Sequence, residues 1–236
     1  MIAPDIHLEI GSLAFEDFDQ IDLTGPFEVF SRLPNSTYRI YGKTAALTRD
    51  IRGLRIMPDA VLGAAPQLDL LHVPGGFGQE AIMDDEEVLA WIGAQAAGAR
   101  SVLSVCTGAL ICGAAGLLKG RRATTHWASM DLLAYFGAVA VNERVVVDGQ
   151  FVFAAGVTAG LDGALRVAAD LRGVEVAQAI QLAIAYAPDP PFHAGTPEEA
   201  PPAVLARVRQ SYERVTAQRE QTARRIAARL GLAVPA

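Results

Sequence analysis

The segment SVLSVCTGAL, residues 101–110, decides the fold, because it joins an apolar strand to a helix through a single cysteine. Residues 101–105 hold valine or leucine at three of five positions, which predicts a buried strand, and the small residues from Gly108 onward predict a helix. The pattern resembles a nucleophile elbow, a tight strand-to-helix turn that presents the nucleophile at the carboxyl end of a sheet. Gly108 fits the close strand–helix approach, but Ser104 replaces the usual first glycine, so the match is partial.

Cys106 is therefore the first candidate for chemistry. A thiol at a helix N-terminus lies near oriented amides, so its pKa is expected to fall below the free value of about 8.5. The alternative interpretation is a small buried hydrophobic residue, as free cysteines commonly are. Cys112, the chain's other cysteine, is expected to pack inside the same helix without a chemical role.

Short β-rich runs alternate with helical stretches along the chain, which predicts one α/β domain with a parallel sheet covered on both faces. Thr24 is the expected N-cap of the first helix, and a turn is expected at Asp148-Gly149. Strands are expected over 7–15, 38–41, 68–73 and 101–105, a hairpin over 45–57 and two strands within 143–154; helices are expected over 23–33, 84–97, 106–115 and 127–136, with one or two within 158–186.

The C-terminal part differs from the domain predicted for residues 1–187. A proline-rich segment begins at residue 188, and a charged helix follows from about 203 to 230, within a second unit of residues 188–236. Such a helix is expected to have few neighbours in its own domain, which predicts a contact with a second copy in a homodimer. A solvated, frayed terminal helix is the alternative.

Composition narrows the function classes. With 236 residues, 51% hydrophobic, and a formal charge of -6, the chain has no broad basic surface for nucleic acid. No apolar run reaches the roughly 18 residues of a membrane span, and the first residues lack the features of a secretory signal, so we expect a cytoplasmic protein without membrane contact. Two cysteines argue against a disulfide framework and against a cysteine-built metal site, and we expect no metal or cofactor.

Two other loops are expected at the same sheet edge as Cys106, because the carboxyl ends of parallel strands lie together. Asp22, in the loop after the first strand, offers a carboxylic acid. Gly75 and Gly76, after the strand at 68–73, offer backbone N–H groups that can hold a developing negative charge. Each has a plainer explanation: acids near helix starts are often caps or first-turn residues, and Pro-Gly-Gly is often only a turn.

Histidines add little to this site. Thr107, not histidine, follows Cys106, so no imidazole adjacent in sequence takes the thiol proton, which disfavours a peptidase. His126 stands just before a predicted helix; a structural hydrogen bond is the favoured role, with a distant general base as the alternative. His72 lies inside a predicted strand and is expected to be structural.

Together these stretches resemble the DJ-1/PfpI superfamily, and within it the members that hydrate isocyanides. The similarity runs from about residue 7 to the C-terminus. It implies a flavodoxin-like three-layer sandwich, a homodimer and Cys106 as nucleophile. The residues that carry it are DLTGP at 22–26, PGG at 74–76, SVCTG at 104–108, ATTHW at 123–127, AGLD at 159–162 and the segment 186–192.

The resemblance also implies a reaction and a set of residues. The expected enzyme is a hydro-lyase that converts isocyanides to N-substituted formamides through a cysteine thioimidate, without a cofactor. Asp22, where many members carry glutamate, is expected to supply the proton, and Thr107 to organise the site. The Gly76 amide is expected to face the thiolate, and Gly75 and Tyr186 to complete the site for substrate or oxyanion.

Two alternatives come from other members that the chain resembles. One is a glyoxalase or deglycase that uses the same cysteine and a nearby acid. The other is a ligand-sensing domain related to transcription regulators, although those regulators append a DNA-binding domain, and only one charged helix follows here. A redox-sensing role for Cys106 is compatible with the enzyme.

Overall fold

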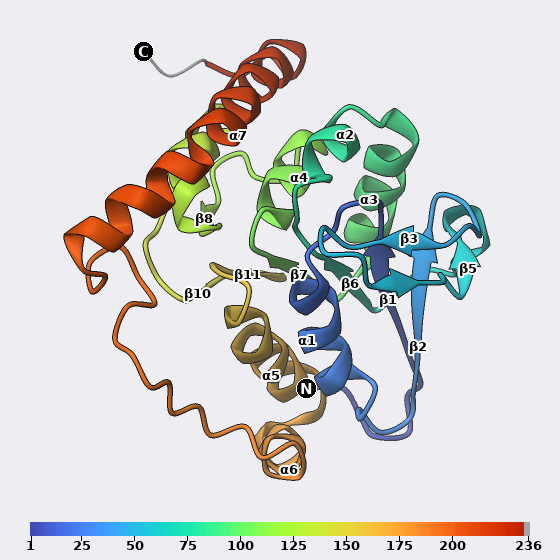
Figure 1. Ribbon diagram of the computed structural model, residues 1–236. Coiled ribbons are helices and arrows are strands. Elements are labelled where there is room, and N and C mark those ends of the chain that lie inside the picture. Colours follow the sequence, from blue (N-terminus) through green and yellow to red (C-terminus); the bar gives the residue numbers. More distant parts are fainter. Residues whose placement is uncertain (234–236) are drawn as a thin grey trace.

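A seven-stranded sheet forms the centre of the computed structural model, which describes residues 1–233 (Figure 1). Its order is β10-β11-β7-β6-β1-β2-β5, and neighbouring strands are parallel except for β10 and β11. The sheet strands are β1 (Leu8–Ala14), β2 (Ser36–Gly42), β5 (Ala60–Val61), β6 (Leu70–Val73), β7 (Ser101–Val105), β10 (Val145–Asp148) and β11 (Phe151–Ala154). Two small ribbons add β3 (Thr48–Arg49) with β4 (Arg55–Ile56), and β8 (Arg122–Ala123) with β9 (Val139–Ala140).

Helices cover both faces of this sheet, which confirms the predicted flavodoxin-like three-layer sandwich with a mostly parallel sheet. One face carries α1 (Gln20–Phe30), α5 (Ala159–Arg172) and α6 (Val174–Ala183). The other carries α2 (Gln79–Met83), α3 (Glu86–Gly98), α4 (Gly108–Ala114), the 3₁₀ helix η2 (Trp127–Phe136) and α7 (Pro202–Arg229). A short 3₁₀ turn, η1 (Leu62–Ala64), follows β5.

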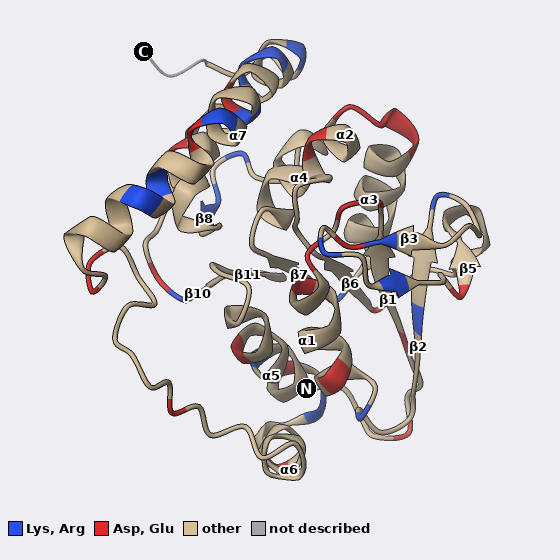
Figure 2. Ribbon diagram, in the orientation of Figure 1, with Lys and Arg blue, Asp and Glu red and all other residues tan. Residues whose placement is uncertain are grey.

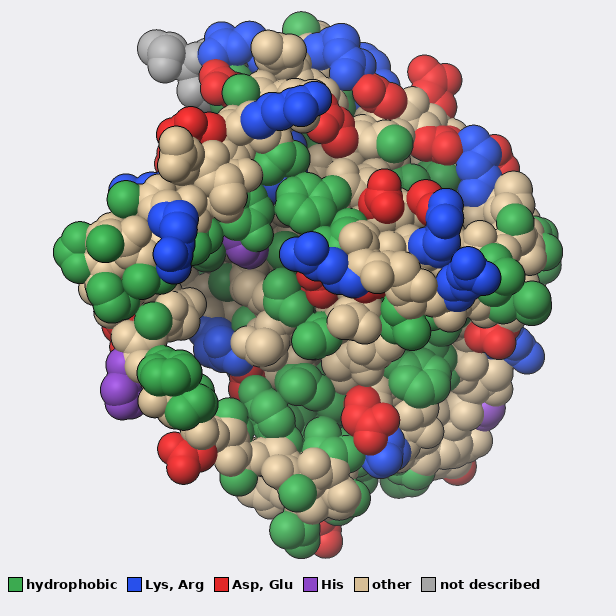
Figure 3. Space-filling model, in the orientation of Figure 1, with side chains coloured by type: hydrophobic (Ala, Val, Ile, Leu, Met, Phe, Trp, Pro, Cys, Tyr) green, Lys and Arg blue, Asp and Glu red, His purple; other side chains and the backbone are tan. Residues whose placement is uncertain are grey.

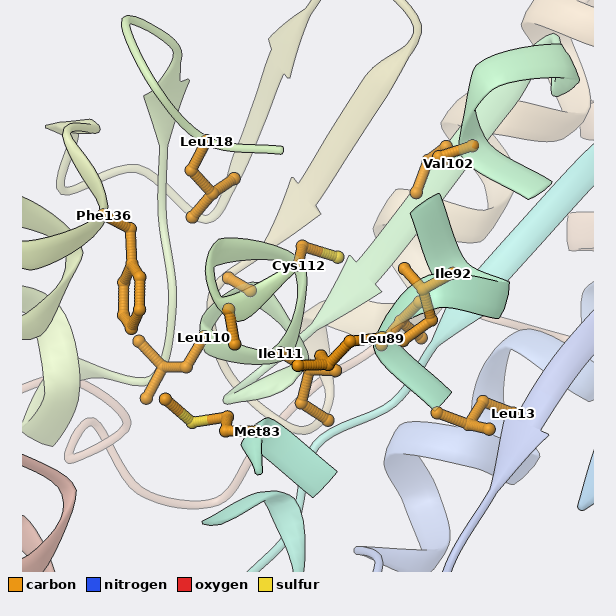
Figure 4. Close-up of a cluster of buried hydrophobic side chains, with 14 of the residues drawn as sticks. Leu13, Met83, Leu89, Ile92, Val102, Leu110, Ile111, Cys112, Leu118 and Phe136 are labelled. Carbon is orange, nitrogen blue, oxygen red and sulfur yellow. The ribbon is translucent and has the colours of Figure 1, made fainter. Parts of the chain in front are cut away.

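Alternation along the strands builds two hydrophobic cores, one on each face. In β6, Leu71 packs into the core beneath α3 and α4, whereas Leu70 packs into the core beneath α1 and α5. Figure 4 shows the first core, with Cys112 among its side chains. Cys112 is fully buried there, and burial raises its thiol pKa to about 12, so its predicted packing role is confirmed.

The first helix begins earlier than predicted. Asp19, not Thr24, is its N-cap, because the Asp19 side chain accepts a hydrogen bond from the Ile21 N–H at 3.1 Å. The Thr24 hydroxyl instead donates to the Gln20 carbonyl one turn back. As a result Asp22 lies in the first turn of α1, where it is fully buried.

Helix α7 also differs from its prediction. Its second half packs against η2, α2 and α4, and Ala223, Ile226 and Ala227 are buried, so the expectation of few neighbours within the chain is wrong there. Its first half is largely exposed, and basic residues gather along the helix (Figure 2). An extended segment over residues 187–201 runs along the outside from α6 to α7 (Figure 1).

The unit at 188–236 and its dimer contact stay predictions, and the last three residues of that unit lie outside the described part. Within residues 1–233, none of the helices combines the length and the apolar character that a membrane crossing requires.

The close approach of β6 and α4 requires a residue without a side chain at position 108, and this requirement can be tested. A Cβ at this position would lie 2.1 Å from the Val73 carbonyl oxygen, so we expect Gly108→Ala to lower the free energy of unfolding by ~1–3 kcal/mol. Gly93→Ala, on α3, is the matched control: nothing lies within 4 Å of its added Cβ, and we expect it to stabilise by ~0.5–1 kcal/mol. Urea unfolding of both variants measures the two effects, and a Gly108→Ala variant as stable as wild type would contradict the elbow geometry.

Candidate active site

Cys106 occupies the predicted elbow between β7 and α4. Its φ of +55° is in the left-handed region, which costs about 1–3 kcal/mol for a non-glycine residue unless the surroundings hold it there. Two hydrogen bonds do so: the Cys106 N–H donates to the Ala154 carbonyl at 2.9 Å, and the Thr125 hydroxyl donates to the Cys106 carbonyl at 2.7 Å. The nucleophile elbow is therefore confirmed, and Thr125 is one of the residues that fix it.

Asp22 reaches the same place from the first turn of α1. One carboxyl oxygen, Oδ2, accepts a hydrogen bond from the Gly75 N–H at 3.0 Å, and the Cys106 thiol lies near enough to the carboxyl to act on its pKa. The other oxygen, Oδ1, is buried and has no well-formed hydrogen bond within residues 1–233. Gly75 permits this convergence, since a Cβ there would lie 2.6 Å from the Thr107 nitrogen and 2.8 Å from Asp22 Oδ2.

Thr107 ties the Pro-Gly-Gly loop to the elbow. The Gly76 N–H donates to the Thr107 hydroxyl oxygen at 3.1 Å, and that hydroxyl lies 3.2 Å from the Gly76 carbonyl, to which it donates. The expectation that the Gly76 amide faces the thiolate is therefore wrong. The backbone amide that acts to lower the Cys106 pKa is the N–H of Thr107 itself. Gly75 and Gly76 brace Asp22 and Thr107, so neither amide is directed at an oxyanion here.

Burial is the main influence on the ionisation of the Cys106 thiol and the Asp22 carboxyl. It raises the pKa of the Asp22 carboxyl well above its ordinary value, and the charge of Asp19 adds to this effect. Burial likewise raises the pKa of the Cys106 thiol, and the neighbouring Asp22 charge raises it further. The predicted lowering of the Cys106 pKa is thus corrected: the Thr107 N–H does lower it, but desolvation is the larger effect. Two such acids in contact titrate as a unit and resist carrying two negative charges.

A small pocket of about 40 Å³ opens on the sulfur. A site of this size admits a few atoms at most, so only a compact group fits against Cys106. No set of three or more His, Cys, Asp or Glu side chains suited to a metal ion occurs among the residues that the structure describes. The pocket is lined by Asp19, Ile51, Gly76, Phe77, Cys106, Thr107, His126, Val157, Tyr212 and Arg219.

A larger cavity of about 360 Å³ adjoins this pocket and shares His126 and Val157 with it. Part of its wall comes from the extended segment, at residues 195–198. Figure 3 shows the corresponding face of the molecule hollowed between the C-terminal segments and the rest of the chain. The two cavities together offer a narrow site at the sulfur and a wider space beside it.

His126 has the structural role that the sequence favoured. Its Nδ1 accepts a hydrogen bond from the Ala128 N–H at 3.3 Å and so caps η2. Burial, together with the positive charge of Arg219, lowers its pKa to about 4, so the ring is neutral at neutral pH. His72 is also structural: it is fully buried in β6, with Nδ1 2.6 Å from the Ser12 hydroxyl.

Tyr186 is not brought to the pocket, contrary to expectation. Its hydroxyl donates to the Asp162 carboxylate at 3.2 Å, and that carboxylate also pairs with Arg144 at 2.7 Å. These three residues line another cavity beside the extended segment, and Cys106 is not part of its wall. Tyr186 therefore serves the packing of that segment within this chain, and it does not line the Cys106 pocket.

Two residues that sequence reasoning missed come from α7. Tyr212 and Arg219 both line the pocket, although they lie more than 100 residues from Cys106 in the chain. Their spacing held a signal, because 212, 219, 223 and 226 fall on one face of a helix. Ala223 and Ile226 on that face are buried, and Arg219 is buried with them.

The fold and this elbow together define a class, the α/β sandwiches that present a reactive side chain at a nucleophile elbow. A sequence profile of the DJ-1/PfpI family matches residues 10–170, and the chain belongs to this family. It is 45% identical over 225 residues to an isonitrile hydratase from Pseudomonas putida, covering 95% of this chain and 99% of that one.

Two further relatives place the chain within the family. A THiJ/PfpI family protein from Pseudomonas syringae superposes with a TM-score of 0.89 at 39% identity, covering 94% of this chain and 91% of the other. A transcriptional regulator from Pseudomonas aeruginosa, HTH-type regulator GbdR, is 30% identical over 185 residues, which is 75% of this chain and 50% of the regulator. The similarity to the regulator therefore leaves half of that protein unmatched.

The buried acid predicts an unusual dependence of stability on pH. Because the folded pKa of Asp22 is raised above its unfolded value of 3.8, the stability contributed by the protonated acid is complete below pH 3.8 and is lost as pH rises through the folded pKa. We expect Asp22→Asn to remove this loss. The free energy of unfolding of wild type should fall relative to the variant from about pH 4 upward, by up to ~1.4 kcal/mol per pH unit. Urea unfolding at a series of pH values measures the difference, and parallel curves would contradict the raised pKa.

Proposed function

We propose that this protein is an isocyanide hydratase that converts R–N≡C and water to the N-substituted formamide. The observation that carries the proposal is the proximity of the Cys106 thiol at the elbow and the Asp22 carboxyl in the first turn of α1, beside a compact pocket. An isocyanide carbon accepts a nucleophile and then requires a proton on the same carbon, and this pair supplies both. The 45% identity to the Pseudomonas putida isonitrile hydratase, over nearly the whole of both chains, supports the same reaction.

The first half of the reaction forms a covalent intermediate. The Cys106 thiolate attacks the terminal isocyanide carbon and forms a C–S bond, which leaves an electron pair on that carbon. Asp22 donates its proton to this electron pair and gives a thioimidate, R–N=CH–S–Cys106. The attacking form of the Cys106–Asp22 pair is therefore the one in which its single negative charge is on sulfur and the carboxyl is protonated.

Water completes the reaction and restores both groups. It attacks the thioimidate carbon while the Asp22 carboxylate accepts one of its protons. The C–S bond then breaks, the electrons return to sulfur as thiolate, and the second water proton ends on nitrogen in R–NH–CHO. Every atom is accounted for without a redox step or a cofactor.

The surrounding residues suit these steps. Thr107 holds the Gly75–Gly76 loop against the elbow, and the Thr107 N–H acts to lower the pKa of the Cys106 thiol. The linear N≡C group is compact enough for the narrow pocket, and the adjoining 360 Å³ cavity offers space for the substituent R. Aspartate rather than glutamate at position 22 shortens the acid by one methylene and leaves room for substrate and water.

A homodimer is part of the same proposal. The largely exposed first half of α7 and the extended segment of residues 187–201 present a surface that a second copy can cover. The resemblance noted from the sequence supports this assembly, and a cytoplasmic location stays a prediction from the sequence.

The direct assay is formamide production from a simple alkyl isocyanide. We expect turnover by wild type, none above background by Cys106→Ala, and a loss of roughly 10²–10⁴-fold in Asp22→Asn, because general acid–base catalysis contributes on that order. Cys112→Ala is the matched control: it removes a thiol that lies in the hydrophobic core away from the pocket, and the folded variant should keep its turnover.

Methylglyoxal serves as the competing substrate in the same assay. Consumption of methylglyoxal without isocyanide turnover would replace the hydratase by a glyoxalase. An unchanged isocyanide rate in Asp22→Asn would reject the role of the carboxyl.

A further inference from the structure

Arg219 is a buried arginine for which the structure provides no ion pair among residues 1–233. Only 3% of the residue is exposed, and no carboxylate lies within 4.0 Å of its guanidinium in the described chain. Nη1 donates to the Ser129 hydroxyl at 3.3 Å, and Nε is buried without a partner. The guanidinium lies 5.6 Å from the centre of the Phe77 ring, a weak cation–π contact. Buried charges are ordinarily paired, so this cation calls for a counter-charge.

The groups that face Arg219 limit which residue can be its counter-ion. Tyr212, on its own helix, is neutral at neutral pH because burial raises the pKa of its phenol. His126, next to η2, is neutral because its pKa is about 4. Glu80, on α2, acts only at a distance, and its carboxylate accepts the hydroxyl hydrogen bond of Thr222 at 2.9 Å. Cys106 also lines the pocket and, of the charges that act on Arg219, that of Cys106 has the largest effect.

Two carboxylic acids near Cys106, Asp19 and Asp22, are the other candidates for the counter-ion of Arg219. Asp19 lines the pocket but caps α1 through the Ile21 N–H. Asp22 is not among the lining residues, and its carboxyl is fully buried next to the sulfur. Arg219 therefore lines the pocket together with the sulfur, whereas the fully buried Asp22 carboxyl does not form part of the pocket lining.

We propose that Arg219 is the counter-ion of the Cys106 thiolate, a positioning residue that holds the single negative charge of the Cys106–Asp22 pair on sulfur. This inference rests on the proposed function in that it takes Cys106 as the nucleophile. It assigns to the C-terminal helix a part of the reaction: α7 carries the cation that sets where the shared proton resides.

The need for such a cation follows from ordinary acidities. A free carboxyl, with a pKa near 3.9, loses its proton long before a thiol, with a pKa near 8.5. Left to these values, the pair would hold a carboxylate and a thiol, which is the wrong way round for attack by sulfur and protonation by Asp22. A positive charge beside the sulfur favours thiolate, and the Thr107 N–H acts in the same direction.

Arginine suits this position better than lysine. Burial lowers the pKa of Arg219, but arginine starts from so high a value that it stays protonated, whereas a buried lysine readily loses its charge. The helix that holds it is anchored on both sides, by the Thr222–Glu80 hydrogen bond and by the buried Ala223 and Ile226. The guanidinium is thereby held in place before substrate arrives.

The test measures the ionisation of Cys106 without any isocyanide. The rate of alkylation by iodoacetamide is followed from pH 5 to pH 10 in wild type, Arg219→Met and Arg219→Lys, with Cys106→Ala as the blank for Cys112. We expect Arg219→Met to raise the apparent pKa of the thiol by about 1 unit or more, a tenfold loss of thiolate below that pKa, and Arg219→Lys to lie between. Formamide formation by Arg219→Met should fall in parallel at neutral pH and recover in part at higher pH.

Arg224→Met is the matched control, since it removes an exposed arginine of the same helix that pairs with Glu220, and it should leave the thiol pKa unchanged. An Arg219→Met variant with wild-type alkylation and a cooperative unfolding transition would overturn the inference. If that variant does not fold, Arg219→Gln replaces it, because glutamine keeps a donor for Ser129. The same increase in the apparent pKa of the thiol is expected. A wild type that hydrates no isocyanide would sink the proposed function, while the alkylation profiles would still decide the role of Arg219.

Discussion

The contact between the Cys106 thiol and the Asp22 carboxyl is the constraint on which the rest of the site depends. Neither group is stable in a hydrophobic interior as an isolated anion, and burial raises the pKa of both. Three strand ends must meet for the contact to exist: β1 leads to Asp22, β6 to the Gly75–Gly76 loop and β7 to Cys106. These strands are neighbours in the sheet, so the parallel topology itself supplies the meeting point.

Two glycines, Gly75 and Gly108, are as important to this contact as Cys106 and Asp22, because they carry no side chain. A Cβ on Gly75 would collide with the Thr107 nitrogen and the Asp22 carboxyl, and one on Gly108 would collide with the Val73 carbonyl oxygen. The left-handed conformation of Cys106 is held by hydrogen bonds from its backbone to Ala154 and from Thr125. The active geometry therefore costs stability locally, and the two hydrophobic cores on either side of the sheet offset that cost.

Much of this arrangement could be predicted from the sequence because it depends on local patterns. The strand at 101–105, the elbow at Cys106 and the convergence of Asp22 with the Gly75–Gly76 loop all follow from strand ends in a parallel sheet. The direction of the Gly76 amide could not be predicted, because the Thr107 hydroxyl competes for it. The pKa of Cys106 was predicted in the wrong direction, since burial depends on the whole packed chain and not on a helix terminus.

The C-terminal helix shows the same limit at longer range. Its charged composition suggested an outer surface, yet one face of its second half completes the pocket with Arg219.

The central claim, a thiolate beside a protonated carboxyl, is tested most directly by infrared difference spectroscopy of wild type against Asp22→Asn at neutral pH. The account predicts a protonated carboxyl band that the variant lacks, with no S–H band from Cys106. An ionised Asp22 together with a Cys106 S–H band would contradict it.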